Sequence, residues 1–418
     1  MIQLGRHIAP GAGIWWSQGS GEPTPLVHAL LDQIEELGPH RAFCGLTWDE
    51  RLTRHLPEQL SLVSYGALGE LRALSRAGRL EVLPCHYSAL PRLFAERRLP
   101  ADVGFVQVSP PDADGYCSLG VGVDYAADAV EHTPVLIAEI NQRMPATVGT
   151  PRIPLPRFAA VIETDRPLHE APVRPADDAE LAIAANVAEL IEDGDTLQMG
   201  VGSLPSAVLD RLTEHEDLGF HSGMISDGVL RLVEKGVLTG AHKEIDPGTI
   251  VTGTALGSAE LYDRLDELPV LFRPASYTHA PHILSRLRSL VSINSAIEVD
   301  LTGQVGAEVR RGVYIGAVGG QVDFSRAAAL TGARSIITVR AASGAHSAIV
   351  PTLHGGGVVT TARSDVDVVV TEHGAAHLRG CDLPERARRL IEVAAPQHRE
   401  ALHREALHRE ALTRGAGS

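Results

Sequence analysis

The stretch Thr196-Leu-Gln-Met-Gly-Val-Gly-Ser-Leu-Pro205 is the part of this chain that most directly indicates its fold class. Thr196–Met199 is a short, mostly apolar run typical of a buried strand, glycines follow it, and Pro205 is typical of the first position of a helix. Backbone N–H groups at such a turn are free to bind an anion, a phosphate or a polarised carbonyl oxygen. The stretch lacks the lysine of a P-loop and the spacing of a dinucleotide-binding loop, so a plain tight turn explains it about as well.

The same alternation of strand and helix extends on both sides of this stretch. Asp177 or Asp178 is a candidate cap for a helix with an apolar face at Ile183, Val187, Leu190 and Ile191, and Gly194 is expected just past its end. Short runs rich in β-branched residues predict further strands at 105–108, 135–140, 250–252, 335–339 and 366–371. This order predicts an α/β fold with mainly parallel sheets covered by helices.

The length of 418 residues is enough for two or three domains. Seven prolines fall between positions 144 and 175, which favours a domain boundary there and predicts domains at 1–165 and 176–402, with a tail at 403–418. Gly19-Ser-Gly-Glu-Pro23 precedes an amphipathic run, as Gly200–Pro205 does. This weak internal similarity suggests two α/β domains of similar topology.

Charge and composition exclude several classes of protein. The chain has 37 Lys and Arg against 52 Asp and Glu, and this net charge of −15 argues against binding nucleic acid or an anionic membrane through a basic surface. No apolar run approaches 18 residues and the N-terminus lacks the apolar segment of a signal peptide, so we expect a cytoplasmic protein. The 4 cysteines form no CxxC pair, and neither a metal site nor a disulfide framework is expected.

Three further segments have patterns that allow either a functional or a purely structural interpretation. The loop from Gly316 to Gly320 allows close approach of backbone to a ligand, although a turn is an equal alternative. Glu298 lies in a run where carboxylates alternate with apolar residues, which by itself favours a structural carboxylate over a catalytic one. The tail from His398 repeats His-Arg-Glu-Ala-Leu three times; because five residues rotate a helix by about 140°, its histidines do not share one face and a solvated helix end or ragged tail is expected.

Six segments taken in order are more specific than any of them alone. They are residues 108–120, 200–205, 221–228 (His-Ser-Gly-Met-Ile-Ser-Asp-Gly), 292–304, 319–324 and 371–374 (Thr-Glu-His-Gly). The series resembles the acetyl-CoA hydrolase/transferase family, especially its 4-hydroxybutyrate and butyrate CoA-transferase branch, from about residue 15 to about residue 402. The resemblance implies two CoA-transferase-like open α/β domains with an active-site cleft between them.

Members of that family use a glutamate in a His-Ser/Thr-Glu-Met segment, whose carboxylate attacks an acyl-CoA and forms a glutamyl-CoA thioester before a second carboxylic acid takes the CoA. In this chain the matching position is Gly223, which has no side chain to form that intermediate. The family's Tyr-x-Asn-x-Pro segment corresponds to Tyr277-Thr-His-Ala-Pro281, which places His279 at the asparagine position. A histidine there is a candidate general base.

The resemblance also implies that the two glycine loops contact the CoA thioester and that their backbone N–H groups stabilise an oxyanion, a role that needs no side chain. Ala317 replaces the first glycine of the family's Gly-x-Gly-Gly-Gln loop, and Ala348 stands where a basic residue is common. The residues expected to contact CoA are Val201, Gly202, Ser203, Leu204, Pro205, Ile297, Gly319 and Gly320.

We therefore expect an enzyme that processes an acyl-CoA or acyl-pantetheine thioester without a glutamyl nucleophile, by hydrolysis or by acyl transfer to a non-carboxylate acceptor. Water or another acceptor would fill the space left at Gly223, and His279 would deprotonate it. Glu298 is a less favoured base, and His221 is expected to support structure or CoA contacts. The expected substrate is a small-molecule thioester or one on a carrier protein, with no metal, and relatives suggest a homo-oligomer.

Two alternatives remain open at this point. One is a CoA-transferase that uses a relocated carboxylate such as Glu298. The other is a non-catalytic binding protein or partner subunit that has kept the fold. The paired replacements at Gly223 and His279 fit a changed reaction slightly better than decay of the site.

Overall fold

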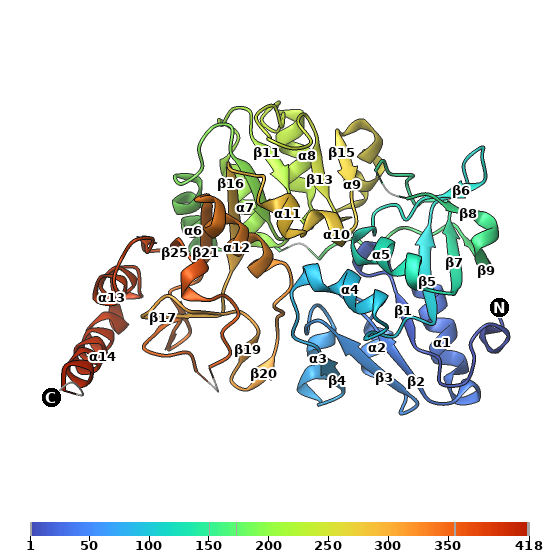
Figure 1. Cartoon of the computed structure of the whole chain (residues 1–418), viewed down its shortest axis with the longest axis horizontal. Coiled ribbons are helices and arrows are strands. Elements are labelled where there is room, and N and C mark those ends of the chain that lie inside the picture. Colours follow the sequence, from blue (N-terminus) through green and yellow to red (C-terminus); the bar gives the residue numbers. More distant parts are fainter. Residues whose placement is uncertain (1, 150, 173, 355–356, 416–418) are drawn as a thin grey trace.

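Two open sheets organise the chain, which the computed structural model describes at residues 2–149, 151–172, 174–354 and 357–415 (Figure 1). The first sheet has seven strands in the order β4-β3-β2-β1-β5-β7-β9, and every neighbouring pair is parallel. Its strands are β1 Ile14–Trp16, β2 His40–Phe43, β3 Leu60–Ser64, β4 Leu80–Val82, β5 Val103–Val108, β7 Val135–Asn141 and β9 Phe158–Thr164.

The second sheet has eight strands in the order β15-β13-β11-β10-β16-β21-β25-β26, and only the β25–β26 pair is antiparallel. Strand β10 lies in its interior, between β11 and β16. The strands are β10 Thr196–Met199, β11 Gly219–His221, β13 Ile250–Thr252, β15 Val270–Phe272, β16 Leu290–Ser295, β21 Arg334–Thr338, β25 Val368–Thr371 and β26 Gly374–His377.

Four short strand pairs and one three-stranded sheet lie outside the two large sheets. They are β6 Tyr116–Cys117 with β8 Ile153–Pro154, β12 Met224–Ile225 with β14 Thr254–Ala255, β17 Glu298–Asp300 with β18 Val305–Gly306 and β24 Ile349–Val350, β19 Val309–Arg310 with β20 Val313–Tyr314, and β22 Ala342–Ser343 with β23 His346–Ser347. The predicted α/β class with mainly parallel sheets is confirmed.

Helices connect and cover the strands (Figure 1). They are α1 Thr24–Leu37, α2 Glu50–Arg54, α3 Leu71–Arg76, α4 Leu90–Ala95, α5 Asp124–His132, α6 Asp178–Ala188, α7 Ser203–Arg211, α8 Asp227–Glu234, α9 Ala259–Asp263, α10 Ala275–Thr278, α11 Pro281–Leu284, α12 Gln321–Thr331, α13 Leu383–Glu392 and α14 Pro396–Gly415. In the part of the chain that the structure describes, none of them is both long and apolar enough to cross a membrane.

Local chemistry explains where two of these helices begin and end. Asp177 caps α6 by accepting a hydrogen bond from the N–H of Glu180, and the Glu180 side chain bonds back to Asp177, which forms a capping box. The helix ends at Ala188, so Gly194 (φ 79°) lies in the following turn and not at the helix end as the sequence suggested. Helix α7 begins at Ser203, two residues before the expected start at Pro205.

The two halves share one core. The largest cluster of buried apolar side chains joins Trp15, Phe43 and Phe94 of the first half to Ile183 and Phe220 of the second. Burial of this continuous apolar surface holds the halves together. The division at 1–165, 176–402 and 403–418 stays a prediction, and the two large sheets lie on either side of its proposed boundary.

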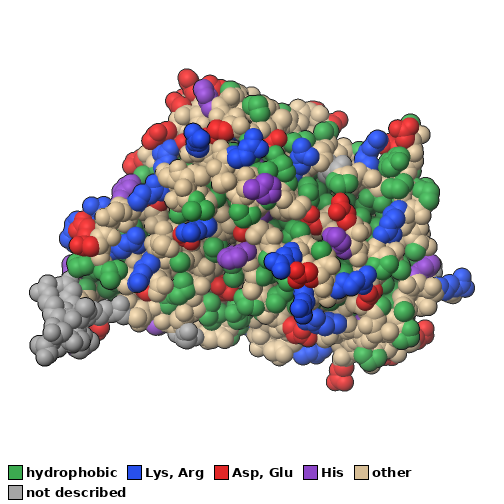
Figure 2. All heavy atoms as spheres, in the orientation of Figure 1, with side chains coloured by type: hydrophobic (Ala, Val, Ile, Leu, Met, Phe, Trp, Pro, Cys, Tyr) green, Lys and Arg blue, Asp and Glu red, His purple; other side chains and the backbone are tan. Residues whose placement is uncertain are grey.

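The surface carries both signs of charge. On the face in Figure 2, acidic and basic side chains are interspersed rather than gathered into one field. The C-terminal helix α14 extends away from the second sheet at one end of the molecule (Figure 1). Its repeats therefore form a helix, one of the two outcomes expected for the tail.

Candidate active site

The loop after β10 presents backbone rather than side chains. Gly202 has a φ of 131°, which favours glycine, and a Cβ built on Gly200 or Gly202 would meet no atom within 4 Å. The first turn of α7 leaves the N–H groups of Ser203 and Leu204 without an acceptor inside the helix. The Ser203 hydroxyl is directed elsewhere, because it donates to Glu180 Oε1 at 2.9 Å.

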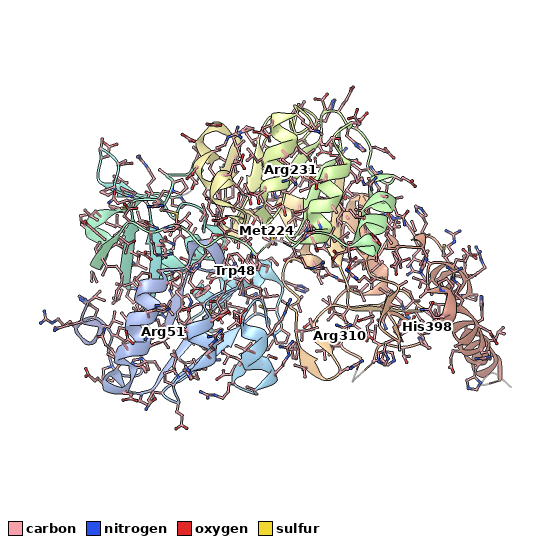
Figure 3. The ribbon with its side chains drawn as sticks, turned by 180° about the vertical axis from the view of Figure 1, so that it is seen from behind. Trp48, Arg51, Met224, Arg231, Arg310 and His398 are labelled. Atoms are coloured by element: carbon pink, nitrogen blue, oxygen red, sulfur yellow. The ribbon has the colours of Figure 1, made fainter. Side chains whose placement is uncertain are left out.

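This loop borders a cavity of about 380 Å³ between the two halves of the molecule. Val201, Gly202 and Ser206 line one side of it, and Leu46, Trp48 and Arg72 of the first half line the other. Figure 3 shows Trp48 where the first half meets the segment that carries Met224. Parallel sheets commonly bind ligands at the loops beyond the carboxyl ends of their strands, and this cavity lies at such a place.

The His279 imidazole lies between two glycines. A Cβ built on Gly223 would lie 2.7 Å from His279 Cε1, and one built on Gly320 would lie 2.5 Å from His279 Nε2. The ring packs on Tyr87, with centroids 4.6 Å apart, and on Phe324 at 5.0 Å. The space beside Gly223 is therefore filled by the imidazole itself, which corrects the expectation that water or an acceptor would occupy it.

The surroundings of His279 keep its ring neutral. Burial, followed by the nearby His221, lowers the pKa of His279 to about 3. The Thr278 hydroxyl donates to the Pro274 carbonyl at 3.3 Å, so it accepts from His279 Nδ1–H at 2.8 Å. Nε2 then carries the lone pair, and no hydrogen-bond partner for it is found among the described residues.

His221 supports the backbone next to His279. Its side chain is fully buried, and Nε2–H donates to the Thr278 carbonyl at 3.1 Å. Burial, followed by the charge of Lys243, lowers the pKa of His221 to about 4. The structure thus brings the two predicted histidines together through Thr278, with His221 in contact with backbone.

The second glycine loop, residues 316–320, forms hydrogen bonds between the two halves beside His279. The Gly319 carbonyl accepts from the Tyr87 N–H at 2.9 Å, and the Gly316 carbonyl accepts from Ala67 at 2.9 Å. Asp323, early in α12, accepts from the Ser88 N–H at 3.1 Å and from its hydroxyl at 2.6 Å. Gly320 therefore lies against His279, and part of this loop is an interface between the halves, while the expected contact of Gly319 and Gly320 with CoA stays a prediction.

Glu298 and Ile297 lie at the small β18-β17-β24 sheet. The Glu298 carboxylate accepts from the His354 N–H at 2.7 Å and pairs with His354 Nδ1 at 2.9 Å. The Ile297 N–H donates to the Gly306 carbonyl at 2.8 Å. No contact in the described parts of the chain joins either residue to His279, so their roles in catalysis and CoA binding stay predictions.

The first half contributes side chains that the sequence did not single out. Gln18 uses its whole amide: Nε2 donates to the Tyr87 hydroxyl at 2.9 Å and to Asp124 at 2.8 Å, and Oε1 accepts from the Tyr65 hydroxyl and the Leu46 N–H. Burial raises the pKa of Asp124 to about 6. These residues are tens of positions apart and carry no motif, so nothing in the sequence pointed to them.

Within the described ranges, no group of three or more His, Cys, Asp or Glu side chains is arranged to hold a metal ion. Three features offer chemistry in this region: free N–H groups at the start of α7, the cavity beside the Val201–Gly202 loop, and the neutral imidazole of His279, which is not among the residues that line that cavity. The N–H groups are suited to polarising a carbonyl; His279 Nε2 has a lone pair that can accept a proton, but the pKa of about 3 makes it a weak base.

Comparison with known proteins gives a consistent result. Residues 3–166 match the acetyl-CoA hydrolase/transferase N-terminal domain, and residues 257–406 match the C-terminal domain of the same name. A 4-hydroxybutyrate coenzyme A transferase of Clostridium kluyveri is 41% identical over 392 residues, covering 91% of this chain and 90% of that protein. An acetyl-CoA hydrolase of Neurospora crassa is 24% identical and covers 93% of this chain and 84% of its own length.

Two solved structures share the architecture. The crystal structure of RipA from Yersinia pestis has a TM-score of 0.91 and 34% identity, and the match covers 97% of this chain and 96% of that one. A 4-hydroxybutyrate CoA-transferase from Porphyromonas gingivalis has a TM-score of 0.79 and 35% identity, with 97% and 95% covered. The fold is thus the one these proteins share.

Proposed function

Because the chain belongs to the acetyl-CoA hydrolase/transferase family, we propose that it processes an acyl-CoA or acyl-pantetheine thioester without a glutamyl intermediate, by hydrolysis or by acyl transfer to a non-carboxylate acceptor. Its relatives are CoA-transferases and acetyl-CoA hydrolases, and the chain is an acyl-CoA hydrolase/transferase-like enzyme. The proposal goes further than the family assignment on one point, which is that the thioester is attacked without a glutamyl intermediate.

One observation supports it most strongly: the His279 imidazole stands where a side chain on residue 223 would begin. The resemblance implies a nucleophilic glutamate at that position, and glycine cannot form the covalent intermediate. The neutral ring, with its lone pair on Nε2, occupies the space where that side chain would start.

In the proposed hydrolysis, the thioester carbonyl oxygen accepts hydrogen bonds from the Ser203 and Leu204 N–H groups, which stabilise the developing oxyanion. Water attacks the carbonyl carbon and gives a proton to His279 Nε2. The carbon–sulfur bond then breaks, and the thiolate takes that proton and leaves as the free thiol. Because the pKa of His279 is lowered to about 3, its protonated form is short-lived and returns the proton readily.

The direct test incubates the pure protein with a panel of acyl-CoAs, with and without acetate, and follows free thiol and products by mass spectrometry. Free thiol without acetate supports the proposal. CoA exchange that requires acetate would favour a relocated carboxylate such as Glu298, and absence of turnover across the panel would favour a binding protein. Acyl-pantetheine on a carrier protein, tested in parallel, identifies the carrier of the thioester.

A pair of variants tests the role of residue 223 more sharply. Gly223→Glu alone places a side chain against His279 and is expected to lower stability without creating transferase activity. Gly223→Glu combined with His279→Asn makes room for the carboxylate, and acetate-dependent CoA exchange by the double variant alone would support the proposed replacement. Equal exchange activity in the single variant would show that His279 does not exclude a side chain there.

We also propose that the protein is a homo-oligomer, as its relatives suggest, and that it is found in the cytoplasm. Light scattering of the purified chain tests the first point, since a monomer at micromolar concentration would contradict it. Fractionation of the source cells tests the second.

A further inference from the structure

The strands at the ends of the two large sheets differ in length. Strand β9 ends the first sheet with 7 residues, whereas β4 and β15 have 3 residues each and β26 has 4. A register shift near the start of β9 leaves residues 160–164 regularly paired with β7, and Figure 1 shows β9 at the outer edge of the molecule. Proteins usually keep edge strands short, because the free N–H and C=O groups of an edge can pair with a strand of another chain.

Half of the backbone groups of β9 have no strand beside them. The Thr164 carbonyl accepts from the Gln142 N–H at 2.9 Å, so Thr164 bonds toward β7. Because alternate residues of a strand direct their backbone groups to opposite sides, Val161 and Glu163 direct theirs away from β7. No hydrogen-bond partner for these groups is found in the described part of the chain. They form a row that a further strand could pair with.

The side chains of β9 give this edge little protection. The strand reads Phe-Ala-Ala-Val-Ile-Glu-Thr, with no proline or lysine and with Glu163 as its one charged residue. Val161 is 37% exposed, and so are Leu155, three residues before the strand, and Tyr116 of the neighbouring β6–β8 pair. Exposed apolar side chains beside free backbone groups are typical of a strand that pairs with another chain.

Charges at the two ends of β9 favour an antiparallel neighbour of the same sequence. Arg157 directly precedes the strand and donates to the Pro134 carbonyl at 3.1 Å. Asp165 directly follows the strand and pairs with Arg143 at 2.7 Å on the surface. Antiparallel pairing of two copies brings the Arg157 end of each strand toward the Asp165 end of the other, whereas parallel pairing would bring like charges together.

The position of Glu163 selects one register among the antiparallel ones. Pairing centred on Val161 places Val161 opposite Val161 and Ala159 opposite Glu163. Pairing centred on Glu163 would place two carboxylates opposite each other, and pairing centred on Ile162 would place each Val161 opposite a carboxylate. Apolar cross-strand pairs stabilise a sheet and like charges opposite each other destabilise it, so the first register is favoured.

We propose that β9 is a dimer interface, at which two copies of the chain pair their β9 strands antiparallel about a two-fold axis through Val161. The two seven-stranded sheets then form one continuous sheet, and Leu155 and Tyr116 extend the contact beyond the strands. A two-fold pairing is closed, so it covers the long edge of both copies and leaves none for a third. The inference rests on the proposed homo-oligomer and is independent of the proposed reaction.

A disulfide tests the position of the axis. In Val161→Cys the two Cα atoms should lie about 5.5 Å apart, within reach of a disulfide. In Glu163→Cys the two cysteines should be offset along the strands by about 13 Å, too far for one. After mild oxidation, non-reducing electrophoresis should show a cross-linked dimer for Val161→Cys and no more than the parent for Glu163→Cys. Cross-linking of neither variant, or of Glu163→Cys alone, overturns the proposal.

A charge on the axis tests the strength of the interface. Val161→Lys places two ammonium groups opposite each other and should raise the Kd of the dimer by roughly 100-fold or more, measured by analytical ultracentrifugation over a dilution series. Leu330→Lys is the matched control, because Leu330 is 63% exposed on α12 of the other half, and its dimer should be as stable as that of the parent. An equal effect of the two substitutions overturns the proposal. Circular dichroism and melting temperature verify that both variants are folded.

The separate proposals fail in different ways. A parent chain that stays monomeric would contradict both the homo-oligomer and this interface. A stable dimer that Val161→Lys leaves intact would contradict the interface alone. A dimer that meets both tests but turns over no thioester would contradict the proposed reaction and leave the interface supported.

Discussion

The two halves of the molecule contain similar glycine loops with opposite surroundings. Gly19–Gly21 follows β1, and its three residues are all buried. A Cβ on Gly19 would lie 2.8 Å from Leu256 Cδ2, and one on Gly21 would lie 2.9 Å from Gly122 Cα. Gly200 and Gly202 follow β10, and a Cβ on either would meet nothing within 4 Å.

The difference shows that one sequence pattern serves two physical purposes. Glycine at 21 is needed because another backbone segment packs against it. Glycine at 200 leaves open space next to the cavity and the free N–H groups of α7. The first loop therefore contributes to packing between segments, and the second is the one left accessible to a ligand.

Buried titratable groups in the two halves have pKa values shifted in opposite directions. The largest expected effect is therefore on how the free energy of unfolding depends on pH. Glu22 follows the first loop and burial raises its pKa to about 8, whereas burial lowers the pKa of His221 to about 4 and of His279 to about 3. Folded Glu22 holds a proton that the unfolded chain releases above about pH 4.5, so its contribution to stability is lost as the pH rises toward 8. The unfolded chain protonates the histidines below about pH 6.5, so their contribution is lost as the pH falls.

Urea denaturation of the parent and of Glu22→Gln between pH 5 and 9 measures the first effect. The variant should gain stability relative to the parent as the pH rises, by an amount on the order of a few kcal/mol across the window. His279→Asn should show the opposite pH dependence. Its free energy of unfolding should rise relative to that of the parent as the pH falls below about 6.5. Parallel stability curves for parent and variant would contradict the burial of the charge in either case.

The second prediction compares one alanine in each loop. Gly21→Ala forces a methyl group against the Gly122 backbone and should lower the free energy of unfolding by about 1–3 kcal/mol. Gly200→Ala meets open space and should change it by less than about 0.5 kcal/mol. The measurement is urea denaturation of both variants, and similar losses for the two would remove the distinction between the loops.

For kcat/KM with an acyl-CoA, the same two variants should rank in the opposite order, with the larger loss in Gly200→Ala. A methyl group on residue 200 narrows the approach to the loop and should lower kcat/KM for the preferred acyl-CoA by about ten-fold, or about 1.4 kcal/mol. Gly21→Ala, assayed at a temperature where it is fully folded, should stay within about three-fold of the parent. A larger loss of activity in Gly21→Ala than in Gly200→Ala would mean that the loop contacting the substrate is the one in the first half.

The sequence predicted much of this architecture because its signals are local. Thr196–Met199 and Ile250–Thr252 form strands as expected, and Asp177 caps its helix. It also pointed to Gly223 and His279 as neighbours, although not to the imidazole filling the space beside Gly223. The contact requires α10, the β11–β12 turn and the start of α12 to converge, and no local pattern encodes that arrangement.

The N-terminal contribution to the site was missed for the same reason. Trp48, Gln18 and Tyr87 are single residues in unremarkable segments, and only the packing of one half on the other gives them their partners. The expectation of an empty space at Gly223 was wrong because the His279 imidazole, far away in the chain, occupies that space.

The smallest expected effect compares the serine in each loop. Ser20 Oγ lies 2.6 Å from the Tyr262 hydroxyl in a fully buried setting, and Ser20→Ala should lower the free energy of unfolding by about 1 kcal/mol. Ser203 donates to Glu180, but Arg174 and the Asp177 N–H also bond to that carboxylate, so Ser203→Ala should lower the free energy of unfolding by about 0.5 kcal/mol or less. Because the Ser203 N–H remains after the substitution, kcat/KM should stay near the parent value. A loss of activity in Ser203→Ala with stability intact would mean that the hydroxyl itself, and not the backbone alone, contacts the thioester.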